Sequence, residues 1–353
     1  FADQRATGVE DSTLTFFHSE EYVSFMRNYE SLSQAERIRP EFGVGLCTDI
    51  PAFKGFFEFS KLVAGSSMLA AELVSQGSHD LVLNWMGGLH HAKRSKASGF
   101  CYVNDCVLGI MRLLLDHRKV LYSDIDVHHG DGVEEAFLNT DRVLTLSFHQ
   151  FDKNVSFFPG TGSIDDVGVG PGKFHAINVP LKRGISDDQY LRVFTRVVDS
   201  VLDAFRPDAI FLQCGADSLV GDVIGGFNLT LQGHGKAVRY VLEKNLPTVC
   251  VGGGGYTVEN VARCWAYESA IALDLELNDF LPSNLLYENN YSSNLLHYHP
   301  KLGQEPNLND SNYLDSVVCK IQQHLKHVNT SVPFLSNANL KDLVAEASED
   351  NKD

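Results

Sequence analysis

Long apolar runs are missing from this sequence. None approaches the roughly 20 consecutive apolar residues that a helix needs to cross a bilayer, so we expect no membrane-spanning segment. A charged-then-apolar leader is also missing, so nothing indicates secretion. The seven cysteines stand singly, with no C-x-x-C pair and an odd total. This pattern favours reduced thiols in an intracellular compartment over a disulfide framework.

Positive charge is scarce as well. The 29 Lys and Arg residues face 45 Asp and Glu residues, which gives a formal net charge of −16. Such a balance argues against direct binding to nucleic acid, whose phosphates are neutralised by cationic side chains. It would steer a cationic partner, such as a lysine-rich peptide, toward the protein. The alternative is that the acidity serves only to keep the chain in solution.

What the sequence does contain is a regular alternation of strands and helices. With 353 residues, of which 44% are apolar and 21% charged, the chain can bury a sizeable core. Apolar runs predict strands at 81–85, 142–149, 175–181, 209–215 and 248–251, and another that begins at Val120. Helices are expected at 60–76, 104–117, 186–205, 230–243, 258–273 and 313–324. Strands separated by such helices predict an α/β fold with a single open, mainly parallel central sheet and helices on both faces.

One domain accounts for most of the chain. We find no internal repeat, and we expect this domain to occupy residues 1–330. From about residue 281 the sequence becomes rich in Asn, Ser and Pro. Residues 331–353 are expected to form a polar, acidic tail, because they offer little apolar surface to bury.

The central feature is the stretch from Val120 to Gly132, where a strand runs into carboxylates and imidazoles. Side chains at alternating positions share a face of a strand, so Asp124, Asp126 and His128 point the same way. Two buried carboxylates beside an imidazole repel one another unless a cation neutralises them. A divalent metal is the simplest such cation. The alternative is a strand end whose acidic residues are solvated or cap the next helix.

Polar side chains also follow the other predicted strands. Ligand sites of parallel α/β sheets lie beyond the carboxyl ends of the strands. The residues that follow the predicted strands at these ends are His90 and His91, Asp124 to Asp131, His149, Asp217, and Tyr256. Asp126, His128 and Asp217 would give three protein ligands and leave positions open, as in a catalytic metal site. Zinc is the metal that we expect, and this donor set also suits Fe(II), Co(II) or Mn(II).

The remaining residues at these strand ends suit acid–base chemistry. One of His90 and His91 can take a proton from water while the other holds or supplies one, and Asp124 and Asp131 can fix their tautomers. The hydroxyl of Tyr256, which follows four glycines, can donate to an oxyanion. Phe100 and Phe158 could wall a slot for an aliphatic chain, or be ordinary core aromatics. Together these residues predict metal-assisted hydrolysis of an amide.

Five motifs made of these residues resemble the metal-dependent histone deacetylases, class I in particular. The motifs are Gly87–Lys93, Ala97–Asp105, Asp124–Glu134, Phe158–Gly162 and Gly252–Thr257. They occur in the family's order, and the similarity runs from about Leu14 to Leu275. The resemblance implies one arginase-like domain that removes acetyl groups from lysine side chains of proteins such as histones.

The resemblance also assigns residue roles. The zinc ligands would be Asp126, His128 and Asp217, and the histidine pair His90 and His91 would be oriented by Asp124 and Asp131. Tyr256 would stabilise the transition state. The substrate would meet five residues: Gly99, Phe100 and Phe158 in the acetyl-lysine tunnel, Asp49 at the rim, and Ile224 in place of the usual leucine or methionine.

Two structural sites for K⁺ or Na⁺ are implied as well. The inner site would use Asp124, Asp126, His128, Ser147 and Phe148. The second would use backbone carbonyls of Phe137, Thr140, Val143 and His175, where the family usually has tyrosine at position 175.

Three departures from the family pattern stand out. The family's first strand and its early basic segment are not found ahead of Leu14. The loop from His149 to Phe158 is a few residues longer than usual. Val223 and Glu259 replace two arginines that hold an inositol polyphosphate in class I enzymes, so we do not expect this chain to bind one.

The expected partners are acetylated histone tails or other acetyl-lysine proteins, together with chromatin-associated proteins, in the nucleus or also the cytoplasm. Alternatives keep the site but change the substrate, to acetylated polyamines or longer acyl-lysines. An arginase-like dinuclear enzyme would need a second full ligand set. A non-catalytic chromatin scaffold would have no need of His90, His91 and Tyr256 together.

Overall fold

The computed structural model describes residues 3–45 and 48–328. Its strands are β1 (Leu81–Asn84), β2 (Val120–Asp124), β3 (Val143–Gln150), β4 (Ala176–Leu181), β5 (Ala209–Gln213) and β6 (Thr248–Val251). Its α-helices are α1 (Asp11–Leu14), α2 (Glu20–Asn28), α3 (Phe56–Ser75), α4 (Asp105–Leu113), α5 (Asp131–Phe137), α6 (Asp187–Phe205), α7 (Leu231–Leu242), α8 (Val258–Ala272) and α9 (Ser311–Leu325).

The six strands form one sheet in the order β1-β6-β5-β2-β3-β4, and every neighbouring pair is parallel. The prediction of a mainly parallel sheet is therefore confirmed, and the described sheet is wholly parallel. From β2 the chain adds β3 and β4 on one side, and β5 then joins β2 on the other side. The order reverses between β2 and β5, and in open α/β sheets ligands bind at this kind of reversal.

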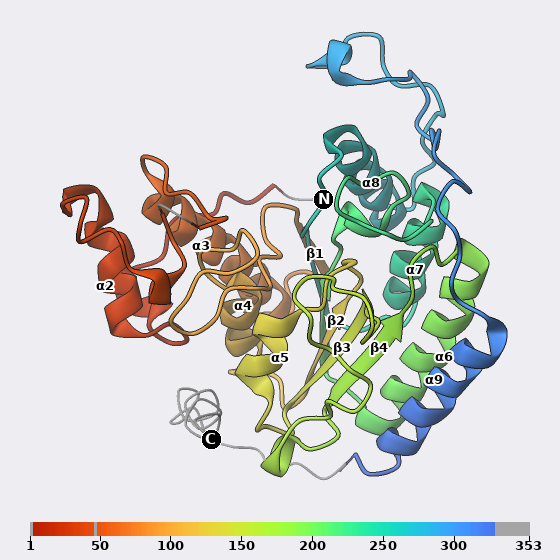
Figure 1. Ribbon diagram of the computed structural model, residues 1–353, viewed down its shortest axis with the longest axis horizontal. Helices are drawn as coiled ribbons and strands as arrows, with labels where there is room; N and C mark the ends of the chain where they lie inside the picture. Colours follow the sequence, from red (N-terminus) through yellow and green to blue (C-terminus); the bar gives the residue numbers. More distant parts are fainter. Residues whose placement is uncertain (1–2, 46–47, 329–353) are drawn as a thin grey trace.

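Helices cover both faces of the sheet (Figure 1). Side chains of the strands alternate between the two faces, so each face has its own apolar core. Tyr122 and Phe211 belong to the core beneath α3, α4 and α5. Leu121 and Leu212, one residue along each strand, belong to the core beneath α6, α7, α8 and α9. Since both faces are buried, the strands are nearly continuous apolar runs, as the sequence indicated.

Local capping explains several helix starts. The side chain of Ser19 accepts a hydrogen bond from the backbone N–H of Tyr22 at the start of α2. Asn104 caps α4 and Thr230 caps α7 in the same way. The expected helix 104–117 is shorter than predicted, because α4 ends at Leu113 and gives way to turns.

Other expectations meet the structure with different outcomes. Between α8 and α9 the described chain contains one short 3-10 turn, Glu288–Asn290, in agreement with its Asn- and Pro-rich composition. The six described cysteines are all unpaired. Among residues 3–45 and 48–328, no helix combines the length and apolarity that a bilayer span requires. The expected tail at 331–353 lies outside the described residues.

Candidate metal centre and active site

Asp126, His128 and Asp217 come together at the carboxyl ends of β2 and β5. His128 Nδ1 lies 3.1 Å from Asp126 Oδ1 and 3.0 Å from Asp217 Oδ2. Each of the three offers a ligand atom within 4.8 Å of the others, and all three side chains are buried. Asp217 stands on a 3-10 turn, Ala216–Ser218, that follows β5 after Cys214 and Gly215. The predicted donor set is therefore one cluster in space.

The charges of this cluster fit a cation. Burial and the nearby charge of Asp126 raise the pKa of Asp217 to about 7, so the two carboxylates resist being ionised together. Although burial lowers the pKa of His128, hydrogen bonds and attraction from both carboxylates raise it to about 10. The cluster thus favours an added positive charge between its carboxylates. Two carboxylates and an imidazole nitrogen are also the donors that zinc and Fe(II) accept.

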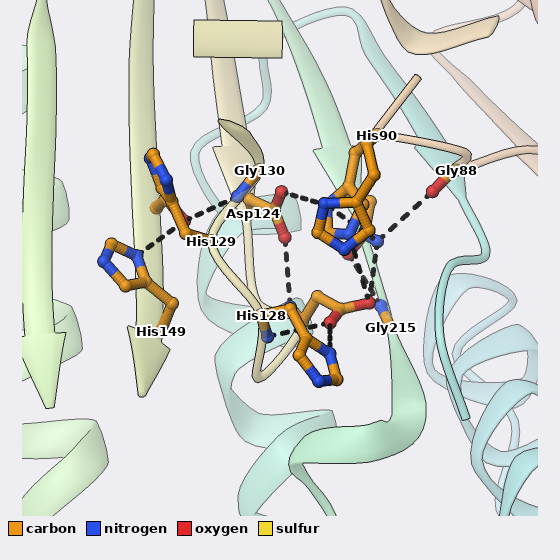
Figure 2. A network of polar contacts seen from close by, with 12 residues as sticks. Gly88, His90, Asp124, His128, His129, Gly130, His149 and Gly215 are labelled. Carbon is orange, nitrogen blue, oxygen red and sulfur yellow. Dashed lines mark hydrogen bonds and ion pairs between the residues drawn. The ribbon is translucent and has the colours of Figure 1, made fainter. Parts of the chain in front are cut away.

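The histidine pair approaches this cluster from the loop after β1. Figure 2 shows His90 directed at Asp124, with Nδ1 and Oδ2 2.7 Å apart. His91 Nδ1 lies 2.7 Å from Asp131 Oδ1. Because a carboxylate accepts, each Nδ1 carries the proton of its hydrogen bond and leaves Nε2 for the site. The two rings lie 3.9 Å apart between centroids, and both are buried.

The pKa values of the two histidines are shifted in opposite directions. Burial lowers the pKa of His90, but the charges of Asp124 and Asp126 outweigh it and raise the value to about 9. Burial and the charge of His90 lower the pKa of His91 to about 3, despite its bond to Asp131. One imidazole of the pair therefore holds a proton while its neighbour stays neutral.

The ring of Tyr256 lies edge-on to that of His128, 6.4 Å away between ring centroids. Burial and the charges of Asp126 and Asp217 raise its pKa well above the usual range, so the phenol keeps its proton and can donate. Asp222 fixes the backbone here, because its Oδ2 accepts from the N–H of Tyr256 at 2.6 Å and of Thr257 at 3.1 Å. Sequence reasoning had given Asp222 no role.

Aromatic rings surround the donors. Phe158 meets the ring of His91 edge-on at 4.9 Å, and Phe100 meets Tyr256 at 5.7 Å. Both phenylalanines are about half exposed, at 47% and 50%, so the alternative that they are core aromatics is wrong. Gly99 packs so closely on His91 that a Cβ there would collide with the imidazole. Phe157, which the sequence did not single out, stacks on His128 at 5.0 Å.

The predicted rim residue Asp49 and the predicted substrate-facing residue Ile224 are both exposed. Asp49 lies on a loop tied to the Phe100 segment, since the hydroxyl of Tyr102 donates to the carbonyl of Pro51 at 2.6 Å. Ile224 is 41% exposed, and its N–H donates to Asp222 Oδ1 at 3.0 Å. The structure thus places Ile224 on the loop that also fixes Tyr256.

The residues of the two implied cation sites are buried and lie at opposite ends of the strands. Asp124 pairs in register with Ser147, and Phe148 follows it on β3. Ser147 Oγ lies 2.9 Å from Nδ1 of His149, which stands on the same strand, β3 (Figure 2). The second set gathers at the end of α5 and the starts of β3 and β4: Phe137, Thr140, Val143 and His175.

Several supporting residues escaped the sequence analysis. Gln213 Nε2 donates to Asp126 Oδ2 at 3.0 Å, and its Oε1 accepts from the N–H of Gly215 at 2.9 Å. Tyr122 Oη donates to Asp124 Oδ2 at 2.5 Å. Lys93 Nζ lies 2.7 Å from Asp131 Oδ2. Their signal was available, since Gln213 and Tyr122 are polar residues inside strands that are otherwise apolar.

A parallel α/β sheet with buried metal-type donors at its carboxyl edge defines an arginase/deacetylase-like class of protein. The histone deacetylase domain family matches residues 2–272, and the chain belongs to this metal-dependent family.

Three curated relatives are similar over most of this chain. Histone deacetylase HDAC1 of Drosophila melanogaster is 49% identical over 315 residues, which cover 89% of this chain and 59% of that protein. Histone deacetylase 1 of Homo sapiens is 47% identical over 315 residues, covering 89% and 64%. Histone deacetylase 2 of Oryza sativa subsp. japonica is 46% identical over 323 residues, covering 91% and 62%. The chain thus spans about three-fifths of the length of these relatives.

Proposed function

We propose that this chain hydrolyses the acetyl amide of acetyl-lysine side chains in proteins such as histones, with zinc as its metal. The observation that carries the proposal is the convergence of Asp126, His128 and Asp217 with two histidines and a tyrosine, beside two half-exposed aromatic rings. Family membership supports it, since the relatives are named histone deacetylases.

The metal would be held by Asp126, His128 and Asp217, with Fe(II) or Co(II) as alternatives to zinc. When bound, the ion supplies a Lewis acid that polarises the amide carbonyl and lowers the pKa of the attacking water. The family's K⁺ or Na⁺ sites would be the two buried sets described above. They would support the loop ends on which the ligands stand.

The histidines would divide the proton transfers. His91 is the neutral partner, so its Nε2 accepts the proton of the attacking water while Asp131 holds its Nδ1–H. His90 keeps its proton against Asp124 and offsets the negative charge of Asp126, from which its Nε2 lies 3.8 Å. The leaving lysine amine then takes a proton from the pair. Two histidines with opposite proton affinities suit a step that needs a base and a nearby positive charge.

Tyr256 would donate to the oxygen that becomes negative as water adds to the amide. Its hydroxyl remains protonated because the nearby carboxylates oppose its ionisation. Gly99, Phe100 and Phe158 would line the slot for the lysine methylenes, with Ile224 beside them and Asp49 at the rim for the peptide backbone. Aromatic walls suit an acetylated lysine, because acetylation removes its charge.

The setting of the enzyme follows from the same assignment. We place it in the nucleus, with the cytoplasm as a second location, acting on histone tails or other acetyl-lysine proteins alongside chromatin-associated partners. The net charge of −16 supports cationic tails as substrates. The deacetylase domain would extend to residue 330, with the polar acidic tail beyond it.

The test compares three substrates on zinc-loaded protein: an acetyl-lysine histone peptide, the same peptide with a longer acyl group, and an acetylated polyamine. We expect acetate release from the acetyl-lysine peptide to be the fastest by kcat/KM. Faster turnover of the longer acyl group or the polyamine would show that this compound, and not acetyl-lysine, represents the preferred substrate class. Metal-loaded protein that hydrolyses none of the three would instead be a scaffold.

A further inference from the structure

A second group of buried donors lies beneath the metal-ligand loop. His234 stands on α7, and Cys264 and Glu268 stand on α8, which packs beside α7 on the same face of the sheet (Figure 1). All three side chains are buried. His234 Nδ1 makes a close charge-assisted contact with Glu268 Oε1, and Cys264 Sγ lies 3.6 Å from the same nitrogen.

This group is built as an ion pair and not as a second metal site. The contact between His234 Nδ1 and Glu268 Oε1 pairs the two atoms that an ion would need as ligands. Burial and the charge of Glu268 raise the pKa of Cys264, whereas a metal ligand must be a thiolate. The thiol stays protonated and donates to Glu268 Oε1 at 3.5 Å.

The second ring nitrogen of His234 faces the active site. His234 Nε2 lies 3.0 Å from the carbonyl oxygen of Gly215. One nitrogen donates to a carboxylate and the other to a carbonyl, so the ring carries both protons. Burial lowers the pKa of His234, but the charge of Glu268 outweighs it and raises the pKa above its ordinary value. The pair thus presents a charged donor to one backbone carbonyl.

That carbonyl belongs to the peptide that leads into Asp217. The other side of the same peptide, the N–H of Ala216, donates to the carbonyl of Gly254 at 2.7 Å. The N–H of Gly254 in turn donates to Asp126 Oδ2 at 2.8 Å. Gly215 itself packs on the Asp126 carboxylate so closely that a Cβ would collide with it. A continuous set of contacts therefore runs from His234 to the Asp126 carboxylate, and Asp217 is the next residue in the chain after Ala216.

The stability of the fold does not require this ion pair. The pair sits in an apolar core with Val238 and Val241, where an ion pair loses its hydration. Replacing a buried pair of this kind by well-packed apolar side chains is often neutral or stabilising. Folding alone therefore does not explain it. We propose that His234 and Glu268 are a positioning pair that fixes the Gly215–Ala216 peptide and thereby aims Asp217 and Asp126 at the metal.

The experiment removes both charges at once, in the variant His234→Leu/Glu268→Leu. The measured quantity is the zinc dissociation constant, by competition with a chelator, beside the melting temperature of the metal-free protein. We expect the melting temperature to change little and zinc to bind about tenfold more weakly, at the lower end of the effect of removing outer-shell partners. Unchanged zinc affinity in this folded variant would overturn the proposal.

A rescue variant tests whether zinc affinity depends on the donor to Gly215 or on the packing of the core. In His234→Gln/Glu268→Leu the glutamine amide restores a neutral donor where Nε2 stood, and zinc affinity should return to within about threefold of wild type. Failure of this rescue in a folded protein would also count against the pair. Val241→Ala, on the same helix, is the control for general loosening of the core and should leave zinc affinity unchanged.

This inference rests on the metal assignment proposed above, and the two fail differently. If wild-type protein binds no zinc, or Asp217→Ala binds it as tightly as wild type, the metal assignment fails. If wild-type protein binds zinc and depends on Asp217, but the leucine pair binds equally well, the positioning pair alone fails.

Discussion

Within residues 3–45 and 48–328, two buried clusters contain donors that metals accept, and they differ in how their charge is balanced. Asp126, His128 and Asp217 bring two carboxylates to one imidazole, so one negative charge is left without a partner inside the cluster. At the second cluster, Glu268 has His234 as its single cationic partner, and Cys264 stays a thiol. We propose that a cation from outside completes the first cluster, whereas in the second cluster the Oε1 of Glu268 is already paired with His234.

The two clusters also differ in whether a substrate could approach them. The first lies where the strand order reverses and is bordered by the half-exposed rings of Phe100 and Phe158. The second is enclosed between α7, α8 and the sheet. Burial and donor type alone therefore do not identify a catalytic metal site. An unbalanced charge and an approach for substrate are the properties that distinguish one from a structural ion pair.

The largest effect is expected where the unbalanced cluster loses a ligand. Asp217→Ala should reduce kcat/KM on an acetyl-lysine peptide by about 10³-fold or more, because the Lewis acid supplies several kcal/mol of transition-state stabilisation. Cys264→Ala removes a donor from the second cluster and should stay within about threefold of wild type. Steady-state kinetics at saturating zinc make the comparison. Equal losses in the two variants would remove the distinction between the clusters.

The next effect concerns the phenol beside the first cluster. Tyr256→Phe removes one donor to the developing oxyanion and should lower kcat by about 10²–10³-fold with a smaller change in KM. Tyr240→Phe, which removes a hydroxyl that donates to Asp199 on the surface, is the matched control. A Tyr256→Phe enzyme with near wild-type kcat would reduce Tyr256 to a packing role.

The buried imidazole of His18 can be compared with those of His128 and His234. Its ring nitrogens contact backbone groups instead of carboxylates. His18 Nε2 accepts from the N–H of Asn104 at 3.0 Å, and Nδ1 lies 3.2 Å from the carbonyl of Arg94. Burial lowers the pKa of His18 to about 4. A histidine whose folded pKa lies below its unfolded value of about 6.5 stabilises the fold above that pH, and this stability is lost as the pH falls toward 4.

The free energy of unfolding should therefore fall by up to about 3 kcal/mol between pH 6.5 and 4 through His18 alone. Chemical denaturation of metal-free protein across this range measures the slope. His18→Gln retains an acceptor for Asn104 but cannot titrate, so its slope should be shallower by that amount. Identical slopes in the two proteins would show that His18 is not a buried neutral imidazole.

The last prediction is that inositol polyphosphate neither binds to this protein nor changes its activity. The Glu259 carboxylate is engaged with Arg263 at 2.7 Å and with the N–H of Ser292 at 3.0 Å, and Val223 is exposed. A carboxylate and an apolar side chain give clustered phosphates no donors at these two positions. Titration of inositol tetrakisphosphate at low salt, by calorimetry and by activity, should show neither binding nor activation. Micromolar binding would contradict this expectation.

Much of the fold could be predicted because strand and helix periodicities are local. All six strands and the larger helices follow from apolar runs, and parallel pairing then carries polar residues such as Asp126 and Asp217 to one edge. The supporting contacts could not be predicted in that way. His234 and Glu268 are 34 residues apart, and neither sits at a strand end. Asp222 contacts Tyr256 across a similar separation, and no pattern in the sequence pairs them.

Metal stoichiometry is the most direct test of the distinction between the two clusters. Zinc-saturated protein is passed through a desalting column and analysed for metal and protein together. We predict one zinc per chain for wild type and for Cys264→Ala, and none retained by Asp217→Ala. Two zinc ions per wild-type chain, with one lost in Cys264→Ala, or one zinc retained by Asp217→Ala, would contradict the account.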